Sequence, residues 1–139
     1  GPRGMGTLGF ALPAAIGAKV AKPEQKFVAL AGDGGFIMLL QELETALRIK
    51  APVVICVLNN GNLEYCKQAQ RGLMGARFIS TDFIETNFSE IAKSFGCRGV
   101  RVTKSSQLAT AIRQALDAPV TTVVEIITPE SAKPDGIAF

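Results

Sequence analysis

The fold is decided by residues 27–62, which read FVALAGDGGFIMLLQELETALRIKAPVVICVLNNGN. Two continuous apolar runs, Phe27–Ala31 and Val53–Leu58, are typical of strands that are buried on both faces. Between them, apolar residues recur every three or four positions from Phe36 onward, which predicts one amphipathic helix reaching about Lys50. A strand, a helix and a second strand in this order predict a right-handed crossover between two parallel strands.

The rest of the chain continues this alternation. The same criteria predict helices over Leu8–Ala21, Asn87–Phe95 and Ser105–Asp117, and strands over Gly99–Val102 and Val120–Ile127. The first of these helices is apolar almost all round, so we expect it to be buried. Residues 63–82 lack clear periodicity and are interpreted as a long active loop with one helical turn. The pattern predicts an α/β fold, with an open, mostly parallel, doubly wound sheet and helices on both faces, in a single domain spanning residues 1–139.

Composition excludes several classes of function. The chain has 139 residues, a net charge of +3 and no Lys/Arg block, so we expect no nucleic-acid and no membrane partner. The absence of His excludes His-based triads and His metal ligands, so catalysis must use carboxylates, amides, backbone groups or a cofactor. An odd number of cysteines, with Cys56 in an apolar run, favours a reduced, cytoplasmic protein. The start at Gly1–Arg3, without Met, predicts a fragment of a longer chain or a tag remnant.

Polar residues follow both strands of the predicted crossover. Asp33 comes just past the end of the first strand and Asn60 just past the end of the second. If the strands are neighbours, their ends lie ~5 Å apart and both residues face the crevice where open α/β sheets bind ligands. Carboxylate, amide and carbonyl oxygens suit Mg²⁺ or Ca²⁺, and Mg²⁺ completes its coordination with phosphate and water. Because Gly34 and Gly35 open a helix, their N–H groups add an anion site. The pattern therefore predicts a metal-bound diphosphate.

These residues resemble a known family. GDG at residues 32–34, followed at this spacing by NN at residues 59–60, resembles the diphosphate-binding motif of thiamine diphosphate enzymes. The upstream stretch GTLGFALPAAIG, residues 6–17, resembles the beginning of the C-terminal, pyrophosphate-binding domain of these enzymes. The resemblance covers about residues 4–128 and is greatest to the group of acetolactate synthase, pyruvate oxidase and benzoylformate decarboxylase.

The resemblance implies roles for individual positions. It assigns the cofactor to Gly6, Leu8, Gly32, Asp33, Gly34, Gly35, Asn60 and Asn62. Within this set, the side chains of Asp33 and Asn60 and the backbone carbonyl of Asn62 would hold Mg²⁺. The amides of Gly34 and Gly35 would hold the diphosphate.

The remaining implied roles concern the reactive end of the cofactor. The Gly6 carbonyl would accept a hydrogen bond from the 4′-amino group, and Leu8 would wedge the cofactor into a bent shape. Tyr65 and Cys66 match positions that shape the substrate pocket, and the resemblance assigns no certain catalytic residue to this chain. Gly35 stands where many relatives have Ser. Tyr65 and Ala69 replace the Met and Trp of acetolactate synthases that favour 2-oxobutyrate, which leaves the acceptor open.

The implied function is that of the cofactor domain of a 2-oxo acid decarboxylating or carboligating enzyme, a transferase or lyase similar to acetolactate synthase. The alternatives are a pyruvate oxidase-like enzyme, a simple 2-oxo acid decarboxylase and, in another class, a non-catalytic phosphate-binding or interaction module. In the family a Glu from a pyrimidine-binding domain or subunit completes the site. We therefore expect an inactive isolated chain and a homo- or hetero-oligomer such as a dimer. FAD would bind only through a domain absent from this chain.

Overall fold

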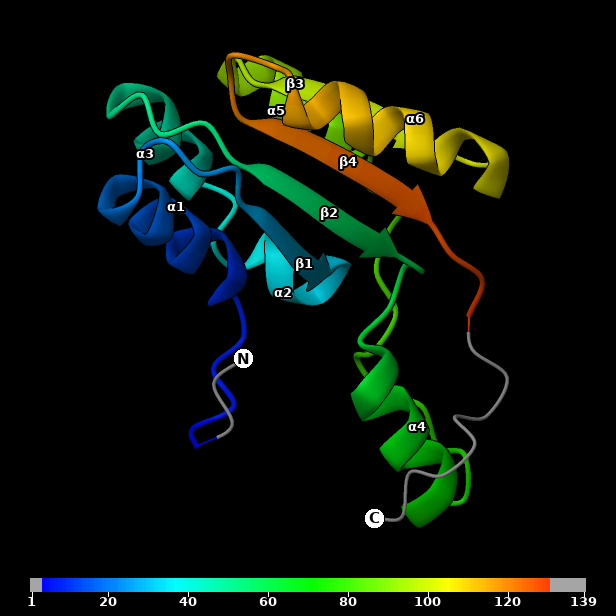
Figure 1. The fold of residues 1–139 in the computed structure, drawn as a ribbon. Coiled ribbons are helices and arrows are strands. Elements are labelled where there is room, and N and C mark those ends of the chain that lie inside the picture. The colour runs from blue at the N-terminus through cyan, green and yellow to red at the C-terminus, as the bar shows by residue number, and fades with distance from the viewer. Residues whose placement is uncertain (1–3, 131–139) are drawn as a thin grey trace.

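The computed structural model describes residues 4–130, so the predicted fragment or tag boundary at Gly1–Arg3 lies outside the described residues. The helices are α1 (Ala11–Ala21), α2 (Asp33–Ile37), α3 (Glu42–Arg48), α4 (Glu64–Leu73), α5 (Phe88–Phe95) and α6 (Ser105–Leu116). The strands are β1 (Val28–Gly32), β2 (Val54–Asn59), β3 (Arg98–Val102) and β4 (Thr122–Ile127). These strands pair in parallel, in the order β1-β2-β4-β3. This arrangement (Figure 1) confirms the predicted open α/β fold.

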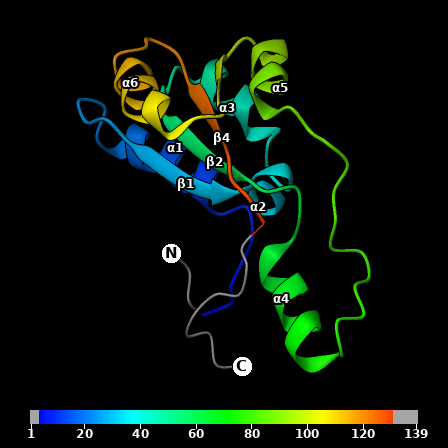
Figure 2. The same cartoon turned by 90° about the vertical axis from the view of Figure 1, so that its right-hand side faces the viewer.

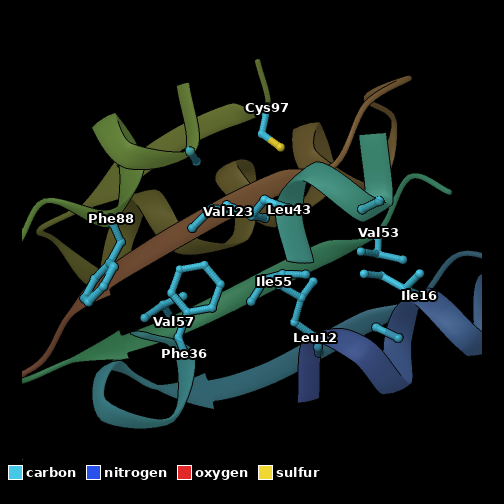
Figure 3. Close-up of a cluster of buried hydrophobic side chains, with 14 of the residues drawn as sticks. Leu12, Ile16, Phe36, Leu43, Val53, Ile55, Val57, Phe88, Cys97 and Val123 are labelled. Atoms are coloured by element: carbon cyan, nitrogen blue, oxygen red, sulfur yellow. The ribbon is translucent and has the colours of Figure 1, made fainter. Parts of the chain in front are cut away.

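Helices cover the two faces of the sheet unequally. One core lies between the sheet and α1, α2, α3 and α5, and a smaller core lies beneath α6 on the opposite face. Figure 2 shows α6 and α5 on opposite sides of the sheet. In the larger core, Phe36 meets Phe88 edge to face with ring centroids 5.5 Å apart, above Ile55 and Val57 of β2 (Figure 3). The crossover from β1 to β2 is thereby packed against α5.

Strand β1 differs from the prediction of burial on both faces. Its residues Val28 and Leu30 are 51% and 65% exposed, whereas Ala29 is buried. The reason is that β1 is the edge strand, and α6 packs over β2, β3 and β4 rather than over β1. The prediction holds for β2, in which Val54–Val57 are all buried.

The expected single helix to Lys50 is wrong, because α2 ends at Ile37 and α3 begins at Glu42. The intervening residues form tighter turns, with i to i+3 hydrogen bonds such as Leu39 N to Phe36 O and Glu42 N to Leu39 O. Hydrophobic spacing survives this break because a tighter turn changes the periodicity only slightly. Spacing alone therefore could not locate it.

Helix α1 begins three residues later than expected, at Ala11, so Leu8 lies outside it. Gly9 has φ +84°, a left-handed conformation that an α-helix does not contain. The helix is also buried along one side only, through Leu12, Ala15 and Ile16. The prediction of burial all round is wrong because α1 packs on β1 and α3 and leaves its outer side uncovered.

The predicted loop at residues 63–82 is wrong over its first half, where α4 spans ten residues. The buried residues of α4 are Lys67 and Gln68 rather than apolar ones. The apolar side chains of α4, such as Tyr65 and Leu73, lie on its exposed side instead. The helix therefore lacks the apolar inner side that the prediction required.

The later elements agree with prediction. Asn87 caps α5 by accepting a hydrogen bond from Glu90 N (3.1 Å), and Gly96 ends the helix with φ +92°. Strands β3 and β4 and helix α6 lie within two residues of their predicted limits. Over residues 4–130, no helix has both the length and the apolar character needed to cross a membrane.

Candidate functional site

A cleft of about 710 Å³ opens at the carboxyl ends of β1 and β2. Its lining consists of Gly6, Leu8, Gly32, Asp33, Gly34, Gly35, Leu58, Asn60, Asn62, Leu63, Glu64, Tyr65, Cys66, Thr128 and Pro129. All the residues expected to contact cofactor or substrate belong to this lining. The structure therefore brings together four stretches that are far apart in sequence.

Asp33 belongs to the lining of the cleft, and the residue is only 3% exposed. Its Oδ1 accepts a hydrogen bond from Gly34 N (2.8 Å), and its Oδ2 accepts one from Gly61 N (2.7 Å). The second bond joins the ends of β1 and β2, which pair in parallel with Gly32 opposite Leu58. Each carboxylate oxygen has two lone pairs, so both can still bind a cation.

The loop after β2 supplies further oxygen atoms. Asn60 donates from Nδ2 to Glu64 Oε2 (2.8 Å), and its Oδ1 accepts from Asn62 N (3.3 Å). Asn62 donates from Nδ2 to the Asn60 carbonyl (3.3 Å), but its buried Oδ1 has no hydrogen-bond partner among residues 4–130. A buried oxygen without a partner is costly and marks a place for a water, an ion or a ligand.

This donor set fits Mg²⁺ joined to a diphosphate. It offers the carboxylate of Asp33 and the side-chain amide oxygen of Asn60. Asn62 offers its side-chain Oδ1 in addition to the expected backbone carbonyl, and all of these are hard ligands. Within residues 4–130 no group of three or more His, Cys, Asp or Glu side chains forms a cation site. One carboxylate and a few amide oxygens leave positions of an octahedral Mg²⁺ that phosphate and water commonly fill.

Two glycines shape the cleft. Gly61 turns the chain after β2 with φ +74°, a left-handed conformation that favours glycine. At Gly34 a Cβ atom would lie 2.5 Å from Leu63 Cδ2, so glycine permits the close packing of the two loops. The Gly34 N–H already donates to Asp33, so a diphosphate that bound this amide would compete with that carboxylate.

Helix α4 forms the far wall, with Tyr65 and Cys66 exposed beside the cleft. Lys67 anchors this helix: its Nζ lies 2.6 Å from Asp82 Oδ1 and 3.2 Å from Glu130 Oε1. The hydrogen bond that Lys67 donates to Asp82 raises the pKa of its ammonium group, which therefore keeps its charge throughout the neutral range. A polar anchor thus fixes α4 relative to the loop that follows it.

The opposite wall contains Gly6 and Leu8, which precede α1. Gly6 has φ +62°, and Leu8 is 53% exposed, with its side chain in the cleft lining. An exposed leucine beside a polar site is available to contact a bound ligand.

Five lining residues were not foreseen: Leu58, Leu63, Glu64, Thr128 and Pro129. Thr128 and Pro129 belong to the site because β4 pairs directly with β2, and nothing in the sequence specified that strand order. Glu64 was detectable in principle, since an acid four residues after Asn60 lies within one helical turn of it.

Comparisons with known proteins bear on the whole chain. The family described as "Thiamine pyrophosphate enzyme, C-terminal TPP binding domain" matches residues 1–126. The chain is 41% identical to the acetolactate synthase of Bacillus subtilis and 39% identical to that of Mycobacterium leprae, over 88% and 81% of its length. It covers 21% and 19% of those two proteins, about a fifth of their length.

A solved structure is also similar. The thiamine diphosphate-dependent 4-hydroxybenzoylformate decarboxylase of Rhodococcus jostii RHA1 superposes with a TM-score of 0.84 at 33% sequence identity. The match covers 91% of this chain and 24% of that one.

Proposed function

Because this chain belongs to the thiamine pyrophosphate enzymes, as their C-terminal TPP-binding domain, we propose that its cleft holds the Mg²⁺-diphosphate end of thiamine diphosphate. Asp33, Asn60 and Asn62 would hold the metal, and Gly34 and Gly35 would face the diphosphate. When bound, this cofactor supplies the electron sink for cleavage next to a 2-oxo group.

One observation carries the proposal. Gly61 N donates to Asp33 Oδ2 across the ends of two neighbouring strands, and the next residue, Asn62, has a buried Oδ1 with no partner among the described residues. The loop after β2 is thereby held next to the carboxylate, so that Asp33, Asn60 and Asn62 line the same cleft. Carboxylate and amide oxygens are the ligands that a hard divalent cation prefers.

The remaining roles concern the ends of the cleft. Gly6 and Leu8 would contact the aromatic part of the cofactor, since they lie across the cleft from α4. Tyr65 and Cys66 would border the substrate. A carboxylate for the pyrimidine ring would come from a pyrimidine-binding domain or partner subunit, because no other acid besides Glu64 and Asp33 belongs to the described lining.

For the complete enzyme, we propose acetolactate synthase-like chemistry on 2-oxo acids, since the named curated relatives are acetolactate synthases. A simple decarboxylase is the second candidate, supported by the name of the similar solved structure. The isolated chain should be inactive, because the proposed site is shared. Decarboxylation of pyruvate by the purified chain alone would contradict this sharing.

Calorimetry tests the cofactor site. Thiamine diphosphate is titrated into the chain together with its pyrimidine-binding domain, with Mg²⁺ present or removed by EDTA. We expect binding only with Mg²⁺, and its loss in Asp33→Ala, because the carboxylate is the one charged metal ligand. Glu85→Ala, at an exposed carboxylate outside the cleft, is the matched control and should bind normally. Unchanged binding by Asp33→Ala would end the proposal.

A further inference from the structure

Glu125 is a carboxylate buried inside the sheet. It lies in β4 between Val124 and Ile126 and has no exposed surface. In the register, Glu125 is opposite Val57 of β2 on one side and Arg101 of β3 on the other. Burying an ionised carboxylate costs several kcal/mol unless hydrogen bonds and charges compensate for the lost water. Its presence in the core therefore requires a physical reason.

Three groups surround this carboxylate. Oε1 accepts a hydrogen bond from Asn59 Nδ2 at 2.8 Å. Oε2 accepts one from Ser89 N at 3.2 Å, in the first turn of α5, and lies 3.9 Å from Arg101 Nε. A helix N-terminus and a guanidinium both stabilise negative charge. These groups compensate for the lost hydration of the carboxylate. Through Asn59, the carboxylate also contacts the end of β2.

Hydrogen bonds of Asn59 connect Glu125 to the cleft. Its Nδ2 donates to Glu125 and to the Thr86 carbonyl (3.1 Å), and its Oδ1 accepts from Gly61 N (3.2 Å). Both groups facing Nδ2 are acceptors, so the orientation of the amide is fixed by its partners. The same Gly61 N–H donates to Asp33 Oδ2. A continuous path therefore runs from Glu125 through Asn59 and Gly61 to Asp33.

We infer that Glu125 is a positioning residue. Through its hydrogen bond with Asn59 it fixes the position of the loop at residues 59–62, and with it the oxygen atoms that would bind the metal. The inference rests on the proposed function for its metal, but the path itself consists of contacts within the protein. Some side chains orient metal ligands through hydrogen bonds without binding the metal themselves. Substituting them commonly changes the affinity for the metal by about 10- to 100-fold. A role limited to supporting α5 would leave metal affinity unchanged.

Exchanging donor and acceptor along the path tests the inference. Glu125→Gln places an NH₂ group against either the Asn59 NH₂ or the Ser89 N–H. Asn59→Asp places two carboxylates face to face. In the double variant N59D/E125Q, the new amide at position 125 donates to the new carboxylate at position 59 and accepts from Ser89 N. The second oxygen of that carboxylate remains available to Gly61 N. The double variant loses the bond to Thr86 and moves the negative charge from position 125, opposite Arg101, to position 59.

The first measurement is the Mg²⁺ affinity at saturating thiamine diphosphate, for the chain together with its pyrimidine-binding domain. We expect each single variant to weaken Mg²⁺ binding by about tenfold or more, and the double variant to return to within about threefold of the parent. Glu85→Gln removes the other carboxylate paired with Arg101 without touching Asn59, so it should leave the affinity unchanged. Equal losses in the single and double variants would overturn the inference.

The second measurement needs no cofactor. Amide hydrogen exchange at Gly61, followed by NMR on the chain itself, should accelerate in Glu125→Gln and slow again in the double variant. If Glu125→Gln does not fold, Asn59→Ala breaks the same path while Glu125 keeps Ser89 and Arg101. It should accelerate Gly61 exchange and weaken Mg²⁺ binding. Unchanged exchange in both variants would refute the positioning role.

The two measurements also separate this inference from the proposed function. A parent protein that binds no Mg²⁺ would refute the proposed metal site. The exchange data would still decide whether Glu125 orders the loop.

Discussion

At the scale of single residues, the three cysteines differ in environment and therefore in chemistry. Cys56 and Cys97 are buried, whereas Cys66 is exposed beside the cleft. Burial disfavours the thiolate and raises the pKa of Cys97 to about 11; it also raises the pKa of Cys56. Although Arg98 follows it in the sequence, Cys97 is therefore a structural residue rather than an activated thiol.

This shift predicts a loss of stability in alkali. In the unfolded chain the Cys97 thiol ionises near its ordinary pKa of 9.0, whereas in the folded chain it stays protonated up to about 11. Between these values the unfolded state binds fewer protons, so the free energy of unfolding falls as the pH rises. Urea unfolding across this range should show the decline, and Cys97→Ala should reduce its slope.

Cys66→Ala is the control and should keep the full slope, because its side chain is exposed. The Lys67 ammonium, whose pKa is raised above 10.5, adds a further loss above that pH in every variant and cancels in the comparison. Equal slopes in the two alanine variants would show that Cys97 is not the group responsible.

The positions of Asp33 and Asn60 could be predicted from the sequence. The hydrogen-bonded path from Glu125 through Asn59 and Gly61 to Asp33 could not. Asp33 and Asn60 each follow an apolar run, and a crossover of that length brings the two runs together. The contact between Asn59 and Glu125 depends on β4 lying next to β2, which no local pattern specifies. The one available signal was the acid itself, isolated within the apolar stretch of residues 123–127.

At the scale of elements, helix α5 and strand β3 approach more closely than any side chain would allow. A Cβ atom built on Gly99 of β3 would overlap the Ser89 carbonyl in the first turn of α5. The same turn donates Ser89 N to Glu125, so this contact also supports the hydrogen-bonded path. Glycine is required at this position because the neighbouring atoms are backbone and cannot rotate away.

Gly99→Ala should therefore destabilise the chain severely, by about 3 kcal/mol or more, because backbone must move to relieve the overlap. The matched control is Gly72→Ala in α4, where a Cβ atom meets nothing within 4 Å. That variant should be neutral or gain up to about 1 kcal/mol, since alanine favours helix. Urea unfolding measures both, and similar stability of the two variants would contradict the close approach.

Elements were predictable where their inner side is apolar. Helix α6 and strands β2 and β4 follow this rule, and α5 adds an Asn cap and a terminal Gly. Helix α4 does not, because Lys67 and Gln68 are its buried residues and its anchors are ion pairs. The tight turns between α2 and α3 also leave no mark in the sequence, since hydrophobic spacing continues through them.

At the scale of the whole molecule, the sheet has an uncovered edge. Among the described strands, β1 pairs only with β2, and its side chains Val28 and Leu30 are largely exposed. An edge strand with exposed apolar side chains tends to associate with another surface.

We expect the isolated chain to self-associate through this edge. In sedimentation experiments its mean mass should rise with concentration, and Leu30→Lys should shift it toward monomer because a charge opposes burial of the strand. Ile84→Lys is the control, since Ile84 is 87% exposed in a loop away from β1. A parent chain that stays monomeric at every concentration, or an equal effect of the two lysines, would contradict this expectation.

The cleft takes its lining from both ends of the described chain. Gly6 and Leu8 come shortly after its beginning, and Thr128 and Pro129 shortly before its end. These segments are joined to the rest of the domain by few elements, and local opening of such segments ordinarily costs less than global unfolding. A molecule seated between them would hold both in place, so its binding free energy would oppose their opening. Binding in the cleft and the local order of these two segments are therefore thermodynamically linked.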